Sequence, residues 1–317
     1  MNCHGDIRNM HIGTKEFTEQ IESLVLLRKD MSINERMLKY HKGEYPFLRI
    51  SSKDIGKDDK IFLICAGVHG DEISGPLTIL ENFNDIVDNA HERGLKLIIY
   101  PLRNPSGFDK GLRHNIDDDR GYFNGNNVLM FYKLKDRTIT GDIMGSDDFL
   151  EWKWLIDSDF DMPLETRVMS EFLREDPISQ IKAVLDIHQD HFTYKPSRKS
   201  SEKSSKKSSK FLLNEGTYHY SFDDLYEYGK TVEKIRIMTS VLGNRRINAG
   251  YDKKKFMKTD SNGFIIRNDG SISDLLHRHR PSVKYNIACE TIGKMDINRA
   301  CAVNLIWIYD LIYLASK

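Results

Sequence analysis

The sequence AGVHGDE at residues 66–72 joins a predicted buried strand to a predicted helix, and the fold class depends on it. Residues 61–65 before it are all apolar, which is typical of a strand in a parallel sheet. Residues 73–87 after it carry apolar side chains at helical spacing. His69 and Glu72 are therefore expected in the loop after the carboxyl end of a strand, where open α/β sheets bind ligands.

The spacing of His69 and Glu72 suits a shared metal ion. Residues three apart across a tight turn can bring an imidazole and a carboxylate to one point, and Gly67 and Gly70 let the backbone turn without a Cβ clash. The pair also has a simpler interpretation, in which Glu72 favours the helix dipole and His69 is an ordinary surface residue. Later parts of the sequence are needed to choose between them.

The composition is that of an ordinary globular protein. The chain has 317 residues, of which 39% are hydrophobic, and its formal net charge is 0. This charge balance gives no reason to expect a nucleic-acid partner. The sequence leaves the oligomeric state open.

The cysteines and the apolar segments indicate a cytoplasmic protein. None of the four cysteines forms a CxxC pair, which favours a reducing compartment over a disulfide framework. Residues 1–15 lack the apolar core of a signal peptide. Residues 301–315 are apolar but too short to span a bilayer comfortably, so we expect no membrane partner.

Strand and helix patterns alternate along the chain, with no internal repeat. Strands are predicted at 45–51, 61–65, 95–100, 181–187 and 283–289. Helices are predicted at 17–27, 73–87, 163–174, 222–242, 274–279 and 301–315. This alternation predicts one α/β domain with a mainly parallel central sheet. We expect residues 1–44 to be a helical extension of the same domain.

Residues 195–210 form a low-complexity basic segment. Seven basic residues oppose one acidic residue there, and serine makes up much of the rest. Such a composition predicts a disordered, solvated loop. Because it follows the strand that ends at His188, an alternative is that it attracts acidic substrates or partners electrostatically.

Three predicted strands end in acidic or imidazole side chains. These are His69 with Glu72, then His188, then Glu290, and in a parallel sheet such ends share one edge. Two histidines and one carboxylate are the protein ligands of a catalytic zinc site, with water in the fourth position. Zinc lowers the pKa of that water and polarises a carbonyl. Glu290 is placed to act as the general base and later the general acid.

Further charged residues surround this predicted site. Arg113 and Arg120 supply fixed positive charge, one suited to an oxyanion and the other to a substrate carboxylate. Asp186 precedes His188 by two residues and shares its face of the strand, so it is a candidate partner of that imidazole. Equally, Asp186 is explained as a buried acid that accepts hydrogen bonds from backbone donors.

Six motifs, taken in order, resemble the zinc carboxypeptidase family and its relatives, the murein-peptide amidases and the aspartoacylase-like deacylases. They are HGDE at 69–72, NPSG at 104–107 with Arg113, the acidic–Arg–aromatic segment 117–123, DIHQD at 186–190, GSISD at 270–274 and ACETIG at 288–293. The resemblance implies a mixed, mostly parallel sheet of about eight strands flanked by helices. It implies a catalytic domain over residues 45–317.

The resemblance also implies a role for each site residue. His69, Glu72 and His188 would hold one Zn²⁺ per chain. Glu290 would activate the zinc-bound water and then protonate the leaving amine, and Arg113 would stabilise the oxyanion.

Two departures from the family concern substrate recognition. The family binds the substrate's terminal carboxylate with an Asn-Arg pair, whereas this chain has Asp119-Arg120, whose Asp would repel a carboxylate unless it is protonated or paired to Arg. The family's mobile pocket Tyr is missing here, and Arg267 near that position either restores a positive charge or is an ordinary surface residue. Ser273 belongs to the implied pocket segment. We therefore expect intact hydrolytic machinery and an unusual substrate.

The predicted function is that of a zinc-dependent metallopeptidase of carboxypeptidase type. It would hydrolyse an amide bond in a small peptide or a peptidoglycan-derived peptide. One alternative is an N-acyl amino acid deacylase, as in the aspartoacylase and succinylglutamate desuccinylase branch. A second alternative is a non-catalytic zinc-binding protein.

Overall fold

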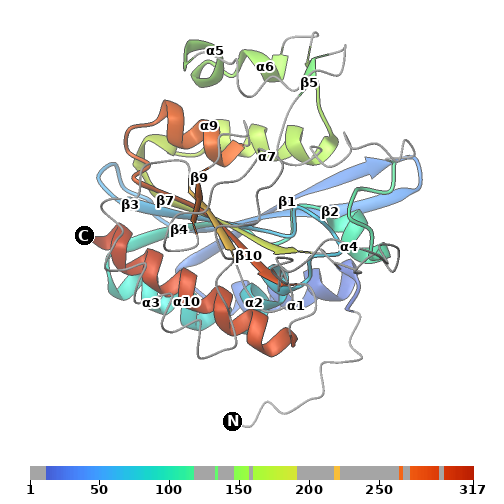
Figure 1. The fold of residues 1–317 in the computed structure, drawn as a ribbon, viewed down its shortest axis with the longest axis horizontal. Helices are drawn as coiled ribbons and strands as arrows, with labels where there is room; N and C mark the ends of the chain where they lie inside the picture. Colours follow the sequence, from blue (N-terminus) through green and yellow to red (C-terminus); the bar gives the residue numbers. More distant parts are fainter. Residues whose placement is uncertain are drawn as a thin grey trace, which may run out of the picture.

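A mixed β-sheet runs through the centre of the molecule, and helices lie against both of its faces (Figure 1). The computed structural model describes residues 12–117, 133–134, 146–156, 160–190, 218–221, 264–266, 272–292 and 296–317. The strands described are β1 (Met31–Tyr40), β2 (Gly43–Ser52), β3 (Lys60–Ala66), β4 (Leu95–Tyr100), β5 (Lys133–Leu134), β6 (Phe160–Asp161), β7 (Ile181–Asp190), β8 (Tyr218–Ser221), β9 (Phe264–Ile266) and β10 (Tyr285–Ile292). The α-helices described are α1 (Thr14–Leu26), α2 (Ser74–Glu81), α3 (Phe83–Glu92), α4 (Pro105–Lys110), α5 (Ser146–Leu150), α6 (Lys153–Ile156), α7 (Leu164–Glu175), α9 (Ile272–His279) and α10 (Ile297–Ser316).

Within the described residues the main sheet has eight strands, in the order β1-β2-β4-β3-β7-β10-β8-β9. The central strands β4, β3, β7 and β10 run parallel to one another. Antiparallel pairs join β1 to β2, β2 to β4, and β10 to β8. This arrangement confirms the predicted mixed, mostly parallel sheet between helices. It also places the carboxyl ends of β3, β7 and β10 at one edge of the sheet.

Alternating side chains of β3 build a hydrophobic core on each face of the sheet. Phe62 and Ile64 pack in the core beneath α1, α2, α3 and α10. Leu63 and Cys65 pack in the opposite core, beneath α7 and α9. Because both faces are covered, the strand is apolar and buried from Ile61 to Ala66, as the sequence pattern at 61–65 indicates.

The edge strand β1 was not expected from the sequence. It pairs with β2 along its whole length. Only Met31 and Leu38 among its ten residues are buried, so its hydrophobic alternation is too weak to predict a strand. Residues 1–44 therefore contribute a strand as well as the predicted helix, which the structure places at α1.

The helix predicted at 73–87 is two helices, α2 and α3, which meet at Asn82. The Asn82 side-chain amide and its backbone N–H both donate to the Thr78 carbonyl, at 3.0 Å and 3.2 Å. Asparagine competes in this way with the regular hydrogen bonds of a helix. The periodic pattern nevertheless continues, because α3 buries Phe83 and Ile86.

The remaining strands and helices predicted within the described residues are confirmed, with their ends shifted by a few residues. The predicted helix 222–242 and the basic loop 195–210 lie outside the described residues. Among the described helices, none has both the length and the apolar character that crossing a membrane requires.

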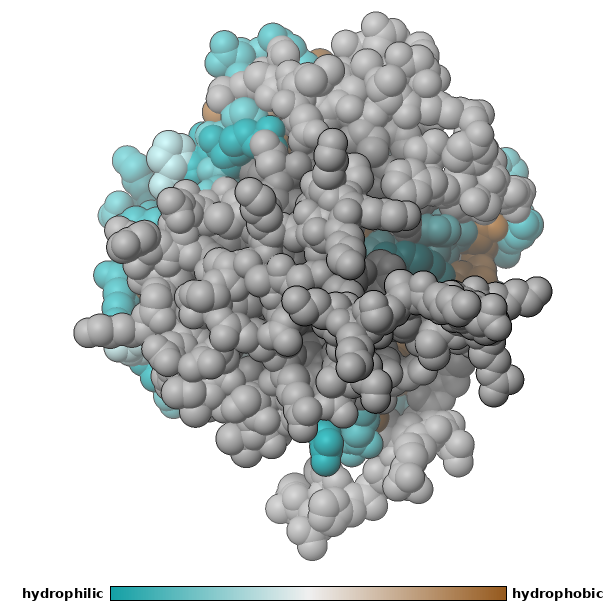
Figure 2. Space-filling view, in the orientation of Figure 1, coloured by the Kyte–Doolittle hydropathy of each residue, from teal (hydrophilic) through white to brown (hydrophobic). Residues whose placement is uncertain are grey.

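The described surface is mostly hydrophilic on the face seen in Figure 2, with small hydrophobic areas. Large exposed hydrophobic side chains in the described residues are Leu26, Leu27, Met37, Leu112, Ile156 and Tyr313. They come from different elements, and scattered apolar residues of this kind are ordinary on protein surfaces.

Glu165, in the first turn of α7, is a fully buried carboxyl group. It accepts hydrogen bonds from the Tyr40 hydroxyl and, at 3.1 Å, from the Asn115 side chain. Burial raises its pKa to about 7, from an ordinary value of 4.5. Between pH 4.5 and about pH 7, the Glu165 carboxyl group therefore keeps its proton in the folded protein and loses it in the unfolded chain.

Stability is expected to fall as pH rises through this window, and Glu165→Gln should remove that loss. Between pH 5 and pH 8 the wild type should lose about 2 kcal/mol more free energy of unfolding than the variant. Urea unfolding at both pH values measures this difference, with Glu175→Gln as an exposed control on the same helix. Equal pH dependence in wild type and Glu165→Gln would contradict it.

Candidate active site

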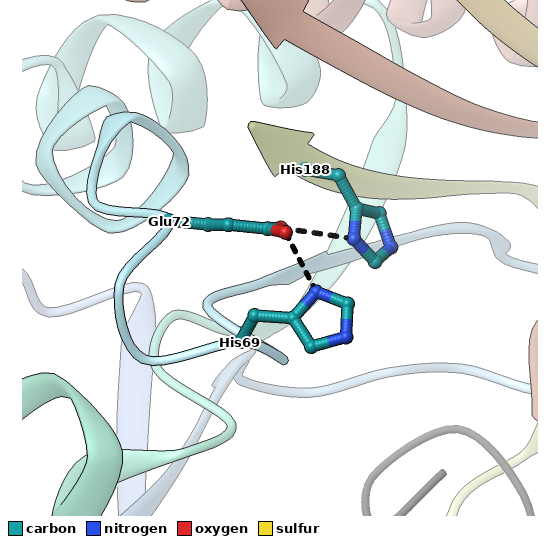
Figure 3. A group of neighbouring side chains, drawn as sticks. All are labelled: His69, Glu72 and His188. Carbon is teal, nitrogen blue, oxygen red and sulfur yellow. Dashed lines mark hydrogen bonds and ion pairs between the residues drawn. The ribbon is translucent and has the colours of Figure 1, made fainter. Parts of the chain in front are cut away.

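Three buried side chains converge at the carboxyl edge of the parallel strands (Figure 3). His69 and Glu72 come from the β3–α2 loop, and His188 comes from β7. The Nδ1 atom of His69 lies 2.7 Å from Glu72 Oε1, and the Nδ1 atom of His188 lies 3.1 Å from Glu72 Oε2. One potential ligand atom of each residue lies within 4.8 Å of the others. The sequence prediction that these residues share one site agrees with this geometry.

The β3–α2 loop packs tightly against α4. The backbone N–H of Gly70 donates to the Arg113 carbonyl at 3.2 Å. A Cβ on Gly70 would lie 2.1 Å from the carbonyl carbon of Gly107, so no side chain fits there. Asn104 caps α4 by accepting a hydrogen bond from the Gly107 N–H at 2.9 Å. The NPSG motif thus forms the surface on which the His69 loop rests.

Replacing Gly70 with Ala is expected to destabilise the protein by about 3 kcal/mol, because the new methyl group meets immovable backbone atoms. Urea unfolding measures the change. The control is Gly56→Ala in an exposed turn, where the nearest atom to a Cβ is Asp59 Oδ2 at 3.5 Å and the expected cost is within about 0.5 kcal/mol. Similar stabilities for the two variants would show that the loops do not pack as described.

Glu72 lies at the centre of a hydrogen-bond network. Besides the two imidazoles, its carboxylate accepts from the Gln189 backbone N–H at 3.1 Å and from Arg113 Nη1 at 2.7 Å. Burial opposes its charge, but the imidazoles of His69 and His188 outweigh burial and hold the pKa of Glu72 well below its usual range. Glu72 is therefore an anionic ligand candidate.

The two histidines differ in their electrostatic surroundings. Burial lowers the pKa of His69, which favours the neutral imidazole that metals bind. Burial acts in the same direction on His188, but the carboxylates of Asp186 and Glu290 outweigh it and raise the pKa of His188 well above its usual value. A metal ion binding here would therefore displace a proton from His188.

Glu290 lies next to His188 in the sheet. The two residues are direct partners in the parallel register of β10 and β7, so their side chains share one face. The Glu290 side chain is buried. The structure thus brings Glu290 to the group of His69, Glu72 and His188.

This donor set fits zinc. Two imidazole nitrogens and one carboxylate are typical protein ligands of a catalytic zinc ion, and these three groups are buried and face one another. Buried charges in proteins are usually paired or bound to metal, and a cation at this point would be bound by all three. No other group of three or more such residues suited to a metal occurs among those described.

Solved structures resemble this chain over nearly its whole length. A proposed metallopeptidase from Shewanella amazonensis has a TM-score of 0.64 and 18% identity, and the match covers 95% of this chain and 92% of that one. A metallo-carboxypeptidase from Burkholderia cenocepacia has a TM-score of 0.55 and 13% identity, covering 94% of this chain and 68% of that one. This chain has the metallocarboxypeptidase fold. Thrombin activatable fibrinolysis inhibitor also matches, with a TM-score of 0.59, 14% identity and coverage of 96% of this chain and 74% of that one. No family model matches the sequence, and no curated protein matches it.

In this metallocarboxypeptidase fold, the other predicted site residues take different places. Arg113 lies at the site, where its half-exposed side chain donates to Glu72. The Ser273 carbonyl, in the first turn of α9, accepts from the Asn286 side chain at 2.8 Å. Asn286 precedes Glu290 by four residues, a separation of about 13 Å along a strand, so the backbone of Ser273 lies away from the metal group. Asp119, Arg120 and Arg267 lie outside the described residues.

Asp186 is a buried acid that contacts side chains, whereas the alternative explanation from the sequence expected it to accept hydrogen bonds from backbone donors. Its Oδ2 accepts from Arg103 Nη1 at 2.9 Å, and its Oδ1 lies 3.5 Å from His188 Nε2. Arg103 was not among the predicted site residues. It directly precedes the Asn-Pro turn after β4, and a charged residue at the end of a buried strand was the available signal.

Proposed function

We propose that this protein is a zinc-dependent hydrolase of carboxypeptidase type, which cleaves an amide bond in a small peptide or a peptidoglycan-derived peptide in the cytoplasm. The observation that carries the proposal is the convergence of His69, Glu72 and His188 at the carboxyl edge of the sheet, beside Glu290. The metallocarboxypeptidase fold supports the same activity, because solved metallo-carboxypeptidases share it.

The residues divide the chemistry between them. The zinc ligands would be His69, Glu72 and His188. When bound there, zinc would act as a Lewis acid that polarises the scissile carbonyl, and it would lower the pKa of water. Glu290 accepts a proton from the attacking water and then donates a proton to the leaving amine. The place of Glu290 next to His188 in the sheet supports this role.

Positively charged side chains complete the proposed site. We assign stabilisation of the oxyanion on the substrate to Arg113, whose side chain is 36% exposed. We assign the substrate carboxylate to Arg120, with Asp119 and Arg267 as further substrate-binding candidates. The hydrogen bond from Arg113 to Glu72 supports the assignment of Arg113 to this site.

A substrate panel tests this proposal. Zinc-loaded protein is incubated with three sets of compounds: peptides with a free carboxyl terminus, the same peptides amidated at the carboxyl terminus, and N-acyl amino acids. Hydrolysis of the free peptides alone is expected. Hydrolysis of the N-acyl amino acids alone would show that the protein is a deacylase instead. If the protein binds zinc but hydrolyses none of the compounds, a non-catalytic binding role is favoured.

A further inference from the structure

Arg103 and Asp186 form an ion pair in the interior of the protein. Each residue is 2% exposed, and the distance between Arg103 Nη1 and Asp186 Oδ2 is 2.9 Å. Taking two charges out of water is costly, and apolar residues of similar size often stabilise a protein at least as well as a buried ion pair does. Stability alone therefore does not account for this pair.

The pair lies directly behind one of the proposed zinc ligands. Asp186 Oδ1 is 3.5 Å from Nε2 of His188, and Nδ1 of the same ring is 3.1 Å from Glu72 Oε2. The imidazole of His188 thus lies between two carboxylates. The Glu72 carboxylate, which would bind the metal, faces Nδ1. The Asp186 carboxylate, which accepts a hydrogen bond from Arg103, faces Nε2.

We propose that Arg103 is a positioning residue for the metal centre. It fixes the Asp186 carboxylate, and Asp186 in turn orients the His188 ring so that Nδ1 faces the metal. Metal-binding histidines commonly have a carboxylate on the nitrogen that does not bind the metal, and such partners affect metal affinity. The inference rests on the proposed zinc centre and adds to it a residue that acts through two others.

A second buried ion pair offers a matched control. Arg49 on β2 donates to Asp176 at the end of α7, and both side chains are largely buried. Arg49 also donates to the Ser51 hydroxyl, and Asp176 accepts from the Tyr100 hydroxyl. Its partners belong to β2, β4 and α7, so its removal changes the same kind of interaction without altering the contacts of His188.

The test compares two double variants of the full-length protein, Arg103→Met with Asp186→Asn and Arg49→Met with Asp176→Asn. Neutralising both members avoids leaving a buried charge unpaired. Metal is removed by chelation, and three properties are measured: urea unfolding of the metal-free protein, zinc affinity by competition with a coloured chelator, and the visible spectrum with Co²⁺ in place of zinc.

We expect the Arg103/Asp186 variant to bind zinc about 10- to 100-fold more weakly and to give an altered Co²⁺ spectrum, while the Arg49/Asp176 variant matches the wild type in both. Arg103→Lys, which keeps the charge but loses the planar fork, should weaken zinc binding by about three- to tenfold. It gives the decisive comparison if the double variant does not fold.

Unchanged zinc affinity and Co²⁺ spectrum in the Arg103 variants overturn the inference. An equal loss in the Arg49/Asp176 variant also overturns it, because the effect is then general destabilisation. A wild type that binds neither metal overturns the proposed zinc site itself, and the two failures are therefore distinguishable.

Discussion

Replacing Glu290 with Gln is expected to lower kcat by about 10³-fold and to leave the zinc content near one ion per chain. Glu290 is buried and is the direct neighbour of His188 in the sheet. The Gln amide fills the same space, so the zinc ligands should keep their positions. It cannot accept a proton from water or return one to the leaving amine. Steady-state kinetics of zinc-loaded protein, with zinc measured by emission spectroscopy, give both quantities.

The control for this substitution is Glu165→Gln, which changes a buried Glu that contacts Tyr40 and Asn115. We expect it to keep kcat near the wild-type value. If Glu290→Gln keeps kcat within tenfold of the wild type, Glu290 is not the general base, and the acid–base group has to be sought elsewhere.

Replacing Glu72 with Gln is expected to weaken zinc binding by more than about 100-fold, beyond the range seen when partners of metal ligands are changed. The carboxylate of Glu72 lies between the Nδ1 atoms of His69 and His188, and its negative charge is held there by both imidazoles and by Arg113. Gln keeps the size of the side chain and removes the charge. Equilibrium competition with a coloured chelator measures the affinity.

The control for Glu72 is its neighbour in the loop. Asp71→Asn removes a carboxylate one residue away that is not part of the metal group, and it should bind zinc within a few-fold of the wild type. Zinc affinity that is unchanged in Glu72→Gln would exclude Glu72 as a ligand, whatever the Asp71 variant does.

The metal group could be predicted from the sequence because it depends on strand ends. His69 follows the apolar run 61–65, and His188 lies near the carboxyl end of β7, which pairs in parallel with β3. Parallel strands bring their carboxyl ends to one edge of the sheet. Glu290 is found by the same reasoning, since β10 pairs in parallel with β7.

Other features depend on contacts that the sequence does not encode locally. Arg103 and Asp186 are 83 positions apart, and their pairing follows from the order of strands in the sheet. The strand β1 cannot be predicted from its sequence, because half of its side chains are polar and only Met31 and Leu38 are buried. Its pairing with β2 makes it a strand. The break at Asn82 depends on a side chain that bonds to its own helix.

Zinc titration of the metal-free wild type by calorimetry is the most direct test of the account. It should show one ion bound per chain, with an affinity that falls as pH decreases, because the ligands must lose their protons and the pKa of His188 is raised. Failure of the folded protein to bind zinc at all would contradict the central claim.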